Sequence, residues 1–490
     1  MTGKRQRIHS ARRAILLAVT ALLAAGPVWA DNADRIRPYE ANPRYWQYKG
    51  KPVLLLGGSD DDNLFQWERS KLEAHLDLLV SVGGNYVRNT MSDRDEGNVY
   101  PFARVRDRYD LSVWSEEYWN RLDIFLRETQ EREIVVQVEL WDAFDWTDDY
   151  GWGNHPWNPA NNVNYTAEQS GLPTSWPHSP HRRDHPFVLT IPGQANADRG
   201  RVVLSLQENF AARVLDACLV YNHVLFTIHN ETSAPHPWSD YWATFLHARA
   251  TANGKSVYVS DMREEDIGNR DPHEYVIGRP HLYNFLEVSK TNRSHKQAHW
   301  DCILLVRSRL EQSGFIRPMN NTKIMYGPPF RTRTDAEKME LVDKFWRNVL
   351  GGTAAARFHR EFNGLGLNDL AQVQIRSVRI FTDAWNVFVC EPRNALLSER
   401  AENEAYCMAQ PGRQYAVYFP DGGAVRLDVS AAESPLQVRW FDIAQSTWQS
   451  PRTADGGKSI ELKAPGEGPW AALIVTQHEL DLNPKEIRKC

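Results

Sequence analysis

Apolar residues alternate between two patterns over the first three quarters of the chain. Short apolar runs, typical of buried strands, lie at 52–59, 85–91, 134–140, 224–229, 256–260, 281–289, 322–326 and 354–359. Segments with apolar residues at helical spacing separate most of these runs, at 71–82, 117–132, 201–221, 240–252, 298–312 and 336–350. Eight strands alternating with helices predict parallel βαβ units that close into a (β/α)8 (TIM) barrel of the α/β class. A doubly wound open sheet is the alternative, but no glycine-rich phosphate loop follows the first strand.

The pattern changes after about residue 375, where only short strand-like runs remain. They lie at 387–390, 415–419, 424–429, 438–442, 459–462 and 471–476. Turn clusters such as Pro420-Asp421-Gly422-Gly423 separate them, which predicts a small antiparallel β-sandwich. We therefore expect a barrel domain at 31–372, a β-sandwich domain at 373–480 and a polar tail at 481–490.

The first 30 residues have the three parts of a signal peptide. Residues 1–13 are basic, residues 14–26 are apolar, and Val28-Trp29-Ala30 offers a cleavage site. A membrane anchor is the alternative, but the apolar run is shorter than the roughly 20 residues that span a bilayer. We predict cleavage after Ala30 and export to the periplasm or medium of a bacterium, with no membrane contact afterwards.

Charge and cysteine content exclude several functions. The chain of 490 residues has 57 Lys+Arg and 62 Asp+Glu; five of the basic residues lie in the first 30, so the remainder has a net charge of −10. An acidic chain without a basic cluster argues against a nucleic-acid partner. No C-x-x-C or H-E-x-x-H motif occurs, so neither a metal nor a cofactor is predicted. A disulfide between Cys390 and Cys407 is possible after export, but spacing leaves it open.

Polar residues follow the predicted strands at the barrel end that carries active sites. Carboxylates and amides hydrogen-bond sugar hydroxyls, and aromatic rings stack on sugar rings, so a polysaccharide or oligosaccharide substrate is indicated. The predicted substrate-binding residues are Asp61, Asp62, Arg88, Asn89, Glu139, Trp141, Asp142, Asn230, His281, Tyr283, Asn284, Tyr326 and His359.

The predicted fourth strand ends in Asn230-Glu231. This placement resembles the acid/base carboxyl of retaining glycosidases of the (β/α)8 clan A. Their chemistry needs a carboxyl that protonates the leaving oxygen and then deprotonates water. The resemblance implies that Glu231 is the catalytic proton donor and that Asn230 binds a sugar hydroxyl. An ordinary Asn-Glu pair at the start of a helix is the alternative.

A second carboxylate is harder to find. Clan A enzymes have a Glu at the end of strand 7, but the segment 322–329 contains none, and the nearest acid is Asp335. We predict Glu287, on strand 6, as the catalytic partner; Glu139 and the Asp61/Asp62 pair are the next candidates. A carboxylate paired with Arg88 or Arg357 is the structural alternative for Glu287. Carboxyl groups about 5 Å apart would indicate retention of configuration, and about 6.5–9.5 Å inversion.

A long insertion follows the third strand, at about 142–200, and is rich in tryptophan. We expect Trp141, Trp146, Trp152, Trp157 and Trp176, with Trp238 and Trp242, to surround the mouth of the barrel and stack on sugar rings. The spacing of the histidines in this insertion fits no metal site, so we predict that they are ordinary loop residues. They are His155, His178, His181 and His185.

Several segments resemble exported bacterial apiosidase-like glycoside hydrolases. These have a (β/α)8 barrel followed by a β domain named for collagen binding. The matching segments are NPRYWQYKGKPVLL (42–55), YDL (109–111), NPANNVNY (158–165), RPMNNTKI (317–324), FWRN (345–348), RFHR (357–360) and GPW (468–470). The resemblance implies a polysaccharide-degrading or glycan-binding role.

Three functions are consistent with the sequence. The first is an exported glycoside hydrolase that uses Glu231 and Glu287. The second is a catalytically silent glycan-binding protein on the same barrel. The third is an unrelated barrel hydrolase or lyase. The sequence gives neither the sugar and its linkage nor the oligomeric state.

Overall fold

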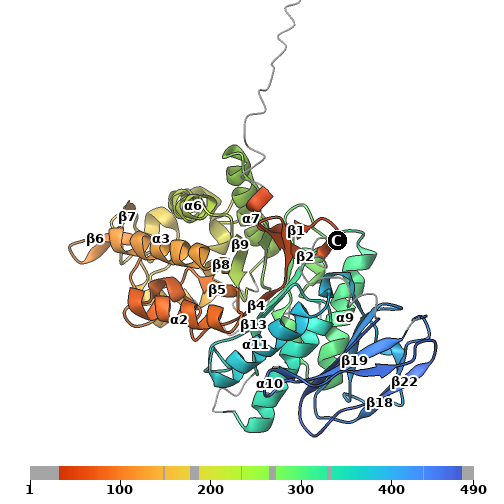
Figure 1. Cartoon of the computed structure of the whole chain (residues 1–490). Helices are drawn as coiled ribbons and strands as arrows, with labels where there is room; N and C mark the ends of the chain where they lie inside the picture. The colour runs from red at the N-terminus through yellow and green to blue at the C-terminus, as the bar shows by residue number, and fades with distance from the viewer. Residues whose placement is uncertain are drawn as a thin grey trace, which may run out of the picture.

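A computed structural model describes residues 33–146, 149–176, 187–232, 234–263, 272–327, 333–433 and 435–476. The predicted signal peptide and the predicted tail at 481–490 lie outside these ranges. Among the described residues, none of the helices has the length and apolarity that a membrane span requires. Figure 1 shows a helix-wrapped sheet with the C-terminal strands packed on its flank.

Eight parallel strands form the central sheet, which confirms the predicted barrel. Their order is β10-β9-β8-β5-β4-β13-β12-β11. The strands are β4 (Leu55–Gly58), β5 (Tyr86–Thr90), β8 (Val135–Asp142), β9 (Val224–Asn230), β10 (Val259–Ser260), β11 (Leu286–Glu287), β12 (Met319–Ile324) and β13 (Ala355–Phe358). β10 and β11 stand at the two ends of this order. The Asn284 N–H, just before β11, donates to the Val259 carbonyl of β10 at 2.8 Å, so the two ends meet and the barrel closes.

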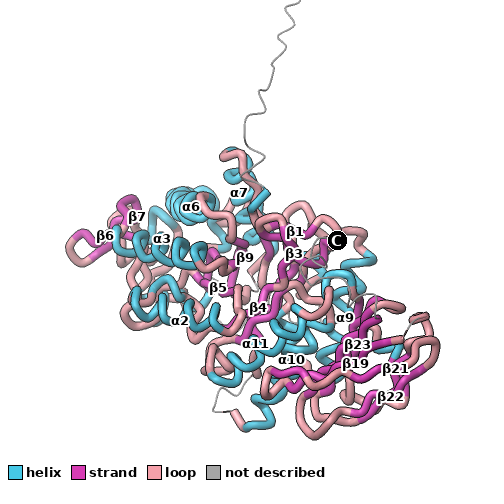
Figure 2. Tube along the Cα trace, viewed as in Figure 1, coloured by secondary structure: helices cyan, strands magenta, loops and turns pink. Residues whose placement is uncertain are grey.

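Helices surround this barrel, as Figure 2 shows. The main ones are α2 (Arg69–Ser81), α3 (Glu116–Glu131), α6 (Ala197–Leu219), α7 (His236–Ala252), α9 (Lys296–Gln312), α10 (Asp335–Leu350) and α11 (Asp369–Asp383). The sequence pattern predicted all of them except α11. Ala371, Ile375 and Val378 of α11 are buried at helical spacing, and Asn368 caps its first turn by accepting the Ala371 N–H.

A small antiparallel sheet closes the N-terminal end of the barrel. It consists of β1 (Arg37–Tyr39), β2 (Asn42–Tyr48) and β3 (Lys51–Val53). The fully buried Trp46 of β2 donates its indole N–H to Asn320 Oδ1 at 2.8 Å and packs on the rings of Tyr258 and Phe285. A functional site must therefore lie at the opposite, C-terminal end.

The C-terminal region is the predicted antiparallel β-sandwich. One sheet contains β14 (Glu391–Pro392), β16 (Tyr406–Gln410), β17 (Gln414–Phe419), β19 (Leu436–Asp442), β20 (Thr447–Trp448), β21 (Arg452–Ala454) and β23 (Trp470–Thr476). The other contains β15 (Leu397–Ser398), β18 (Ala424–Asp428) and β22 (Ser459–Lys463). Cys390 and Cys407 are buried free thiols, so the disulfide that spacing allowed is not formed.

The larger sheet is buried on both of its faces. Alternate residues of β17 point in opposite directions: Val417 belongs to the sandwich core, whereas Tyr418 packs on the barrel. Tyr418 stacks on Trp346 of α10 with ring centroids 5.2 Å apart, and Trp448 stacks on Phe381 of α11 at 5.5 Å. Helices α10 and α11 thus lie between the barrel strands and the sandwich (Figure 2).

This contact should make stability depend on pH through Asp343 of α10. Its carboxyl accepts the Tyr418 hydroxyl, and burial raises its pKa to about 7. The folded state binds the proton of the Asp343 carboxyl more tightly than the unfolded state does. The contribution of this proton to the free energy of unfolding is therefore lost as pH rises from about 4 to 7. We expect Asp343→Asn to remove about 2–4 kcal/mol of this dependence. Urea unfolding of both proteins between pH 5 and 8 measures it; parallel pH profiles would contradict the prediction.

Candidate active site

Glu231 lies immediately after β9, at the C-terminal end of the barrel. Its φ of 55° is left-handed, which costs on the order of 1 kcal/mol for a residue other than glycine. The side chain is almost fully buried, and Oε1 lies 2.9 Å from Lys323 Nζ and 3.1 Å from Lys290 Nζ. Lys323 comes from β12, and Lys290 comes from the 3-10 turn η4 (Ser289–Arg293). Two ammonium groups therefore stabilise one carboxylate.

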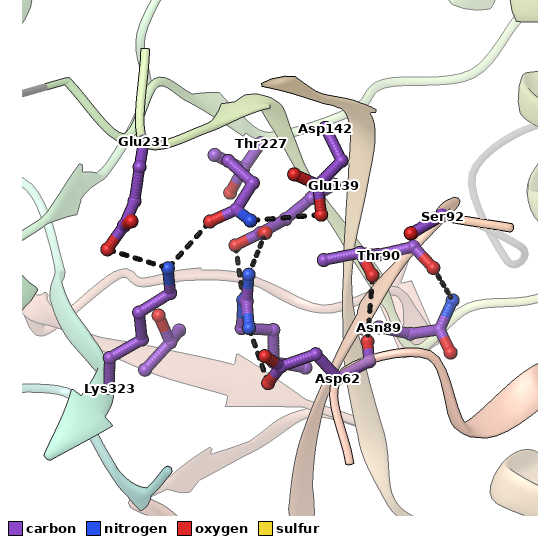
Figure 3. Close-up of polar contacts among 12 residues, drawn as sticks. Asp62, Asn89, Thr90, Ser92, Glu139, Asp142, Thr227, Glu231 and Lys323 are labelled. Carbon is purple, nitrogen blue, oxygen red and sulfur yellow. Dashed lines mark hydrogen bonds and ion pairs between the residues drawn. The ribbon is translucent and has the colours of Figure 1, made fainter. Parts of the chain in front are cut away.

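Lys323 connects strands 3, 4 and 7 of the barrel. Besides contacting Glu231, its Nζ donates to Asn230 Oδ1 at 2.6 Å. The Asn230 amide in turn donates to Asp142 Oδ2 at 3.0 Å. Figure 3 shows the adjacent ion pair of Lys323 with Glu231. Burial lowers the pKa of Lys323, and Glu231 opposes this shift. The amide of Asn230 is thus held in one orientation beside Glu231.

A second network centres on Arg88 of β5, whose side chain is fully buried. Its guanidinium donates to both oxygens of Glu139 at 2.7 and 2.5 Å and lies 2.5 Å from Asp62 Oδ1. His359 Nδ1 and Arg357 approach the same Asp62 oxygen at 3.3 and 3.6 Å.

The buried charges shift the pKa values in this network. Burial would raise the pKa of Asp62, but Arg88 and His359 outweigh it and hold the pKa well below its usual range. Burial raises the pKa of Glu139 despite the opposing charge of Arg88. Burial also lowers the pKa of His359 to about 4, so its imidazole is neutral at pH 7.

Glu287 points into the barrel and is fully engaged there. Oε1 accepts the backbone N–H of Ser289 at 2.8 Å and also its hydroxyl, while Oε2 accepts from Thr322 Oγ1 at 2.8 Å and Gln137 Nε2 at 3.4 Å. The partners of Glu287 are thus neutral donors, and not Arg88 or Arg357 as the structural alternative predicted. Lys323, rather than Glu287, contacts Glu231. The catalytic role of Glu287 stays a prediction.

Three predicted substrate-binding residues lie elsewhere because β11 is much shorter than the strand predicted at 281–289. His281, Tyr283 and Asn284 precede β11, on its N-terminal side. Asn284 Oδ1 accepts the Val259 N–H at 3.3 Å at the start of β10. The Tyr283 hydroxyl donates to Asp240 of α7 at 2.8 Å, outside the barrel sheet. Of the site residues predicted on that strand, Glu287 alone lies inside the barrel, against Gln137 and Thr322.

Four further predicted residues have contacts that position loops or fill the interior. Asp61 Oδ2 accepts the Trp67 indole N–H at 3.0 Å, and Asn89 Oδ1 accepts the Phe65 N–H at 3.1 Å. Tyr326 packs on the ring of His295, with centroids 4.7 Å apart. Trp141 is buried against Trp242, with centroids 5.0 Å apart. The structure thus brings together Asp62, Arg88, Glu139, Asp142, Asn230, Glu231 and His359.

The tryptophans near the mouth are not a stacking surface, which corrects the sequence-based expectation. Six of them are at most 2% exposed: Trp141, Trp146, Trp152, Trp157, Trp238 and Trp242. They pack against one another and against Phe187 and Phe210, because burying large rings is strongly favourable. The insertion is therefore a wall with its own aromatic core. His178, His181 and His185 lie outside the described residues.

Sequence reasoning missed Lys323 and Lys290. It also missed the cluster that Arg94 forms with Asp142 and Asp145. Arg94 contacts Asp142 Oδ2 and lies 3.6 Å from Asp145 Oδ1. Burial, aided by the charge of Asp142, raises the pKa of Asp145 to about 8. A lysine in a strand predicted to be wholly buried was the available signal for Lys323, since buried lysines are almost always paired.

Comparison with known proteins identifies the fold class. No family profile matches the sequence, and no curated protein matches it either. A solved structure named as a glycoside hydrolase has a TM-score of 0.63 at 11% identity, covering 92% of this chain and 98% of its own. A glycoside hydrolase family 5 structure from Bacteroides vulgatus ATCC 8482 has a TM-score of 0.60 at 11% identity, covering 92% and 95%. The chain therefore has a TIM-barrel fold like that of these enzymes.

Proposed function

We propose that the protein is a glycoside hydrolase that cleaves a polysaccharide or oligosaccharide at the C-terminal mouth of the barrel. The observation that carries this proposal is Glu231, a nearly buried carboxylate on strained backbone directly after the fourth strand. Such backbone conformations persist where the surrounding structure enforces them and are concentrated at functional sites. The overall likeness to glycoside hydrolases supports the proposal at the level of fold.

Glu231 is the group that transfers the proton. Because two ammonium groups stabilise its negative charge, it begins the reaction as a carboxylate and accepts a proton from water or a sugar hydroxyl. Glu139 and Asp142 are labelled together with Glu231 in Figure 3 and are the candidates for the second carboxyl. Asn230, oriented by Lys323 and Asp142, faces the same region and can bind a sugar hydroxyl.

The test is hydrolysis of a panel of neutral polysaccharides by the purified protein and by Glu231→Gln, measured as reducing ends released. Equal turnover by the two proteins would contradict the proposal. Export is part of the proposal and rests on the N-terminal segment alone. N-terminal sequencing of protein recovered from the periplasm or medium should begin at Asp31.

A second candidate is a catalytically silent glycan-binding protein. Lys323, at the end of the seventh strand, contacts Glu231 where a two-carboxylate mechanism would use a second acid. This alternative predicts that the wild type cleaves none of the panel and that Glu231→Gln binds glycans with undiminished affinity.

Lys323→Met should separate a positioning role of this lysine from a structural one. Removing a cation 2.9 Å from Glu231 makes its carboxylate easier to protonate. We expect kcat to fall about tenfold and the acidic limb of the pH–rate profile to move up by about one unit. Kinetics between pH 4 and 9 measure both, with the partly exposed Lys338→Met as the control. An unmoved limb would contradict the positioning role.

A further inference from the structure

We propose that Asp93, Asp145 and His155 form a binding site for one divalent cation in the wall of the barrel mouth. One ligand atom from each residue lies within 4.8 Å of the other two, and all three residues are buried. They come from separate segments: Asp93 follows β5, Asp145 ends the 3-10 turn η2 (Ala143–Asp145), and His155 follows α4 (Asp149–Asn154).

The spacing fits a cation with small side-chain adjustments. Ligands bound at about 2.0–2.2 Å from a metal lie about 3–4 Å from one another. The atoms of the three residues must therefore approach by up to about 1–2 Å, which rotamer adjustments supply. His155 Nε2 already faces Asp93 Oδ1 at 3.8 Å.

Asp93 supplies an independent indication of a missing ligand. Its side chain is only 6% exposed, and no other described residue donates a hydrogen bond to its carboxylate. The 3.8 Å separation from His155 is too long for such a bond. A buried carboxylate whose hydrogen bond comes from its own backbone N–H alone is costly, and a cation would remove part of that cost.

The local charge also favours a cation. Asp93, Asp142 and Asp145 lie in one buried region, and Arg94 contacts only the latter two. Asp145 accepts one further hydrogen bond, from Ser92 Oγ at 2.6 Å. Three carboxyl groups thus share one guanidinium in this buried region.

The donor set indicates the class of cation. Two carboxylate oxygens and one imidazole nitrogen suit Zn²⁺ or Mn²⁺, whereas Ca²⁺ and Mg²⁺ prefer oxygen ligands alone. A neutral imidazole ring is the form that binds metals. Binding through Nε2 would place the ring proton on Nδ1. A protonated Nδ1 cannot accept a hydrogen bond, so the 3.3 Å bond from the Trp157 N–H would be lost.

An occupied site would hold the insertion against the barrel. The cation would tie the loops after β5 and β8 to the segment after α4. Arg94 extends this link to Asp142, which in turn holds Asn230 beside Glu231. The cation would thus stabilise the wall next to the proposed catalytic centre without entering the reaction, so this inference does not depend on the proposed function.

The experiment uses the full chain after dialysis against a chelator. Calorimetric titration with ZnCl₂, MnCl₂, MgCl₂ and CaCl₂ should show one equivalent of Zn²⁺ or Mn²⁺ bound, with a rise in Tm of about 2 °C or more. Asp93→Asn and Asp145→Asn should each weaken binding at least 100-fold and lose the rise. Their metal-free Tm should stay close to that of the wild type, because each change replaces a buried carboxyl group by an amide of nearly the same size.

Asp107→Asn is the matched control, since this exposed aspartate lies in the neighbouring turn between β6 (Phe102–Val105) and β7 (Arg108–Trp114). It should bind the cation as the wild type does. Absence of a one-equivalent site, equal binding by Asp93→Asn and Asp145→Asn, or a preference for Ca²⁺ or Mg²⁺ would overturn the proposal. These outcomes are independent of whether any polysaccharide is cleaved.

Discussion

Glu231→Gln is expected to lower kcat for glycan cleavage by about 10³-fold and to leave glycan binding nearly unchanged. The amide is close to the carboxylate in size but cannot accept and return the proton. It also loses the ionic part of its contacts with Lys323 and Lys290, at 2.9 and 3.1 Å. Because those ammonium groups stay near the amide oxygen, the fold should be retained.

The measurement is kcat and KM on the best substrate of the panel, with the exposed Glu402→Gln as the control. An aryl glycoside with an acidic leaving group sharpens the test, because such a group departs with little help from a proton donor. Because Glu231 begins the reaction as a carboxylate, the variant should lose as much activity on this substrate as on the polysaccharide. A smaller loss on the aryl glycoside would show instead that Glu231 protonates the leaving oxygen.

Arg88→Met is expected to destabilise the protein by about 3–5 kcal/mol, the largest effect on stability that we predict. The guanidinium is fully buried and is the direct partner of two buried carboxylates, Glu139 and Asp62. Methionine fills much of the space but leaves both carboxylates without this partner. The cost therefore reflects uncompensated buried charge more than lost packing.

Urea unfolding of the wild type and the variant measures this difference. The surface variant Arg127→Met, which removes a long contact with Asp123, should cost less than about 0.5 kcal/mol. Adding Glu139→Gln to Arg88→Met should recover part of the loss, because one of the two orphaned charges is removed. Additive destabilisation by the two changes would contradict this explanation.

The barrel could be predicted from the sequence because its strands are wholly buried and read as short apolar runs. Helix α11 was missed although Ala371, Ile375 and Val378 have helical spacing. This helix lies where the pattern passes from alternating strands and helices to strands alone. The sequence analysis put that change at about residue 375, which is inside α11. Boundaries of this kind depend on which element must cover the sheet, which a local pattern does not contain.

The candidate site could be predicted only in part. Glu231 follows a strand whose end is unambiguous, so its place at the mouth could be predicted. Tyr283 and Asn284 were predicted at the wrong end of the sixth strand. That strand, β11, has two residues, so the apolar pattern does not show where it begins and ends. Lys323 was overlooked because its partner follows β9, a strand that is not a neighbour of β12 in the sheet and is reached only by a long side chain. Tryptophan content, likewise, does not distinguish a buried ring from one that faces solvent.

The sheet that is buried on both faces has a consequence for how the chain can be divided. One face contributes Tyr406, Tyr418 and Phe441 to the same apolar core as the barrel helices. A fragment ending after α11 would expose the rings of Trp346 and Phe381 to water, and the isolated strands would expose the opposite side of that contact. The β-sandwich is thus not a detachable module that can be exchanged between enzymes, and the barrel is unsuited to being produced without it.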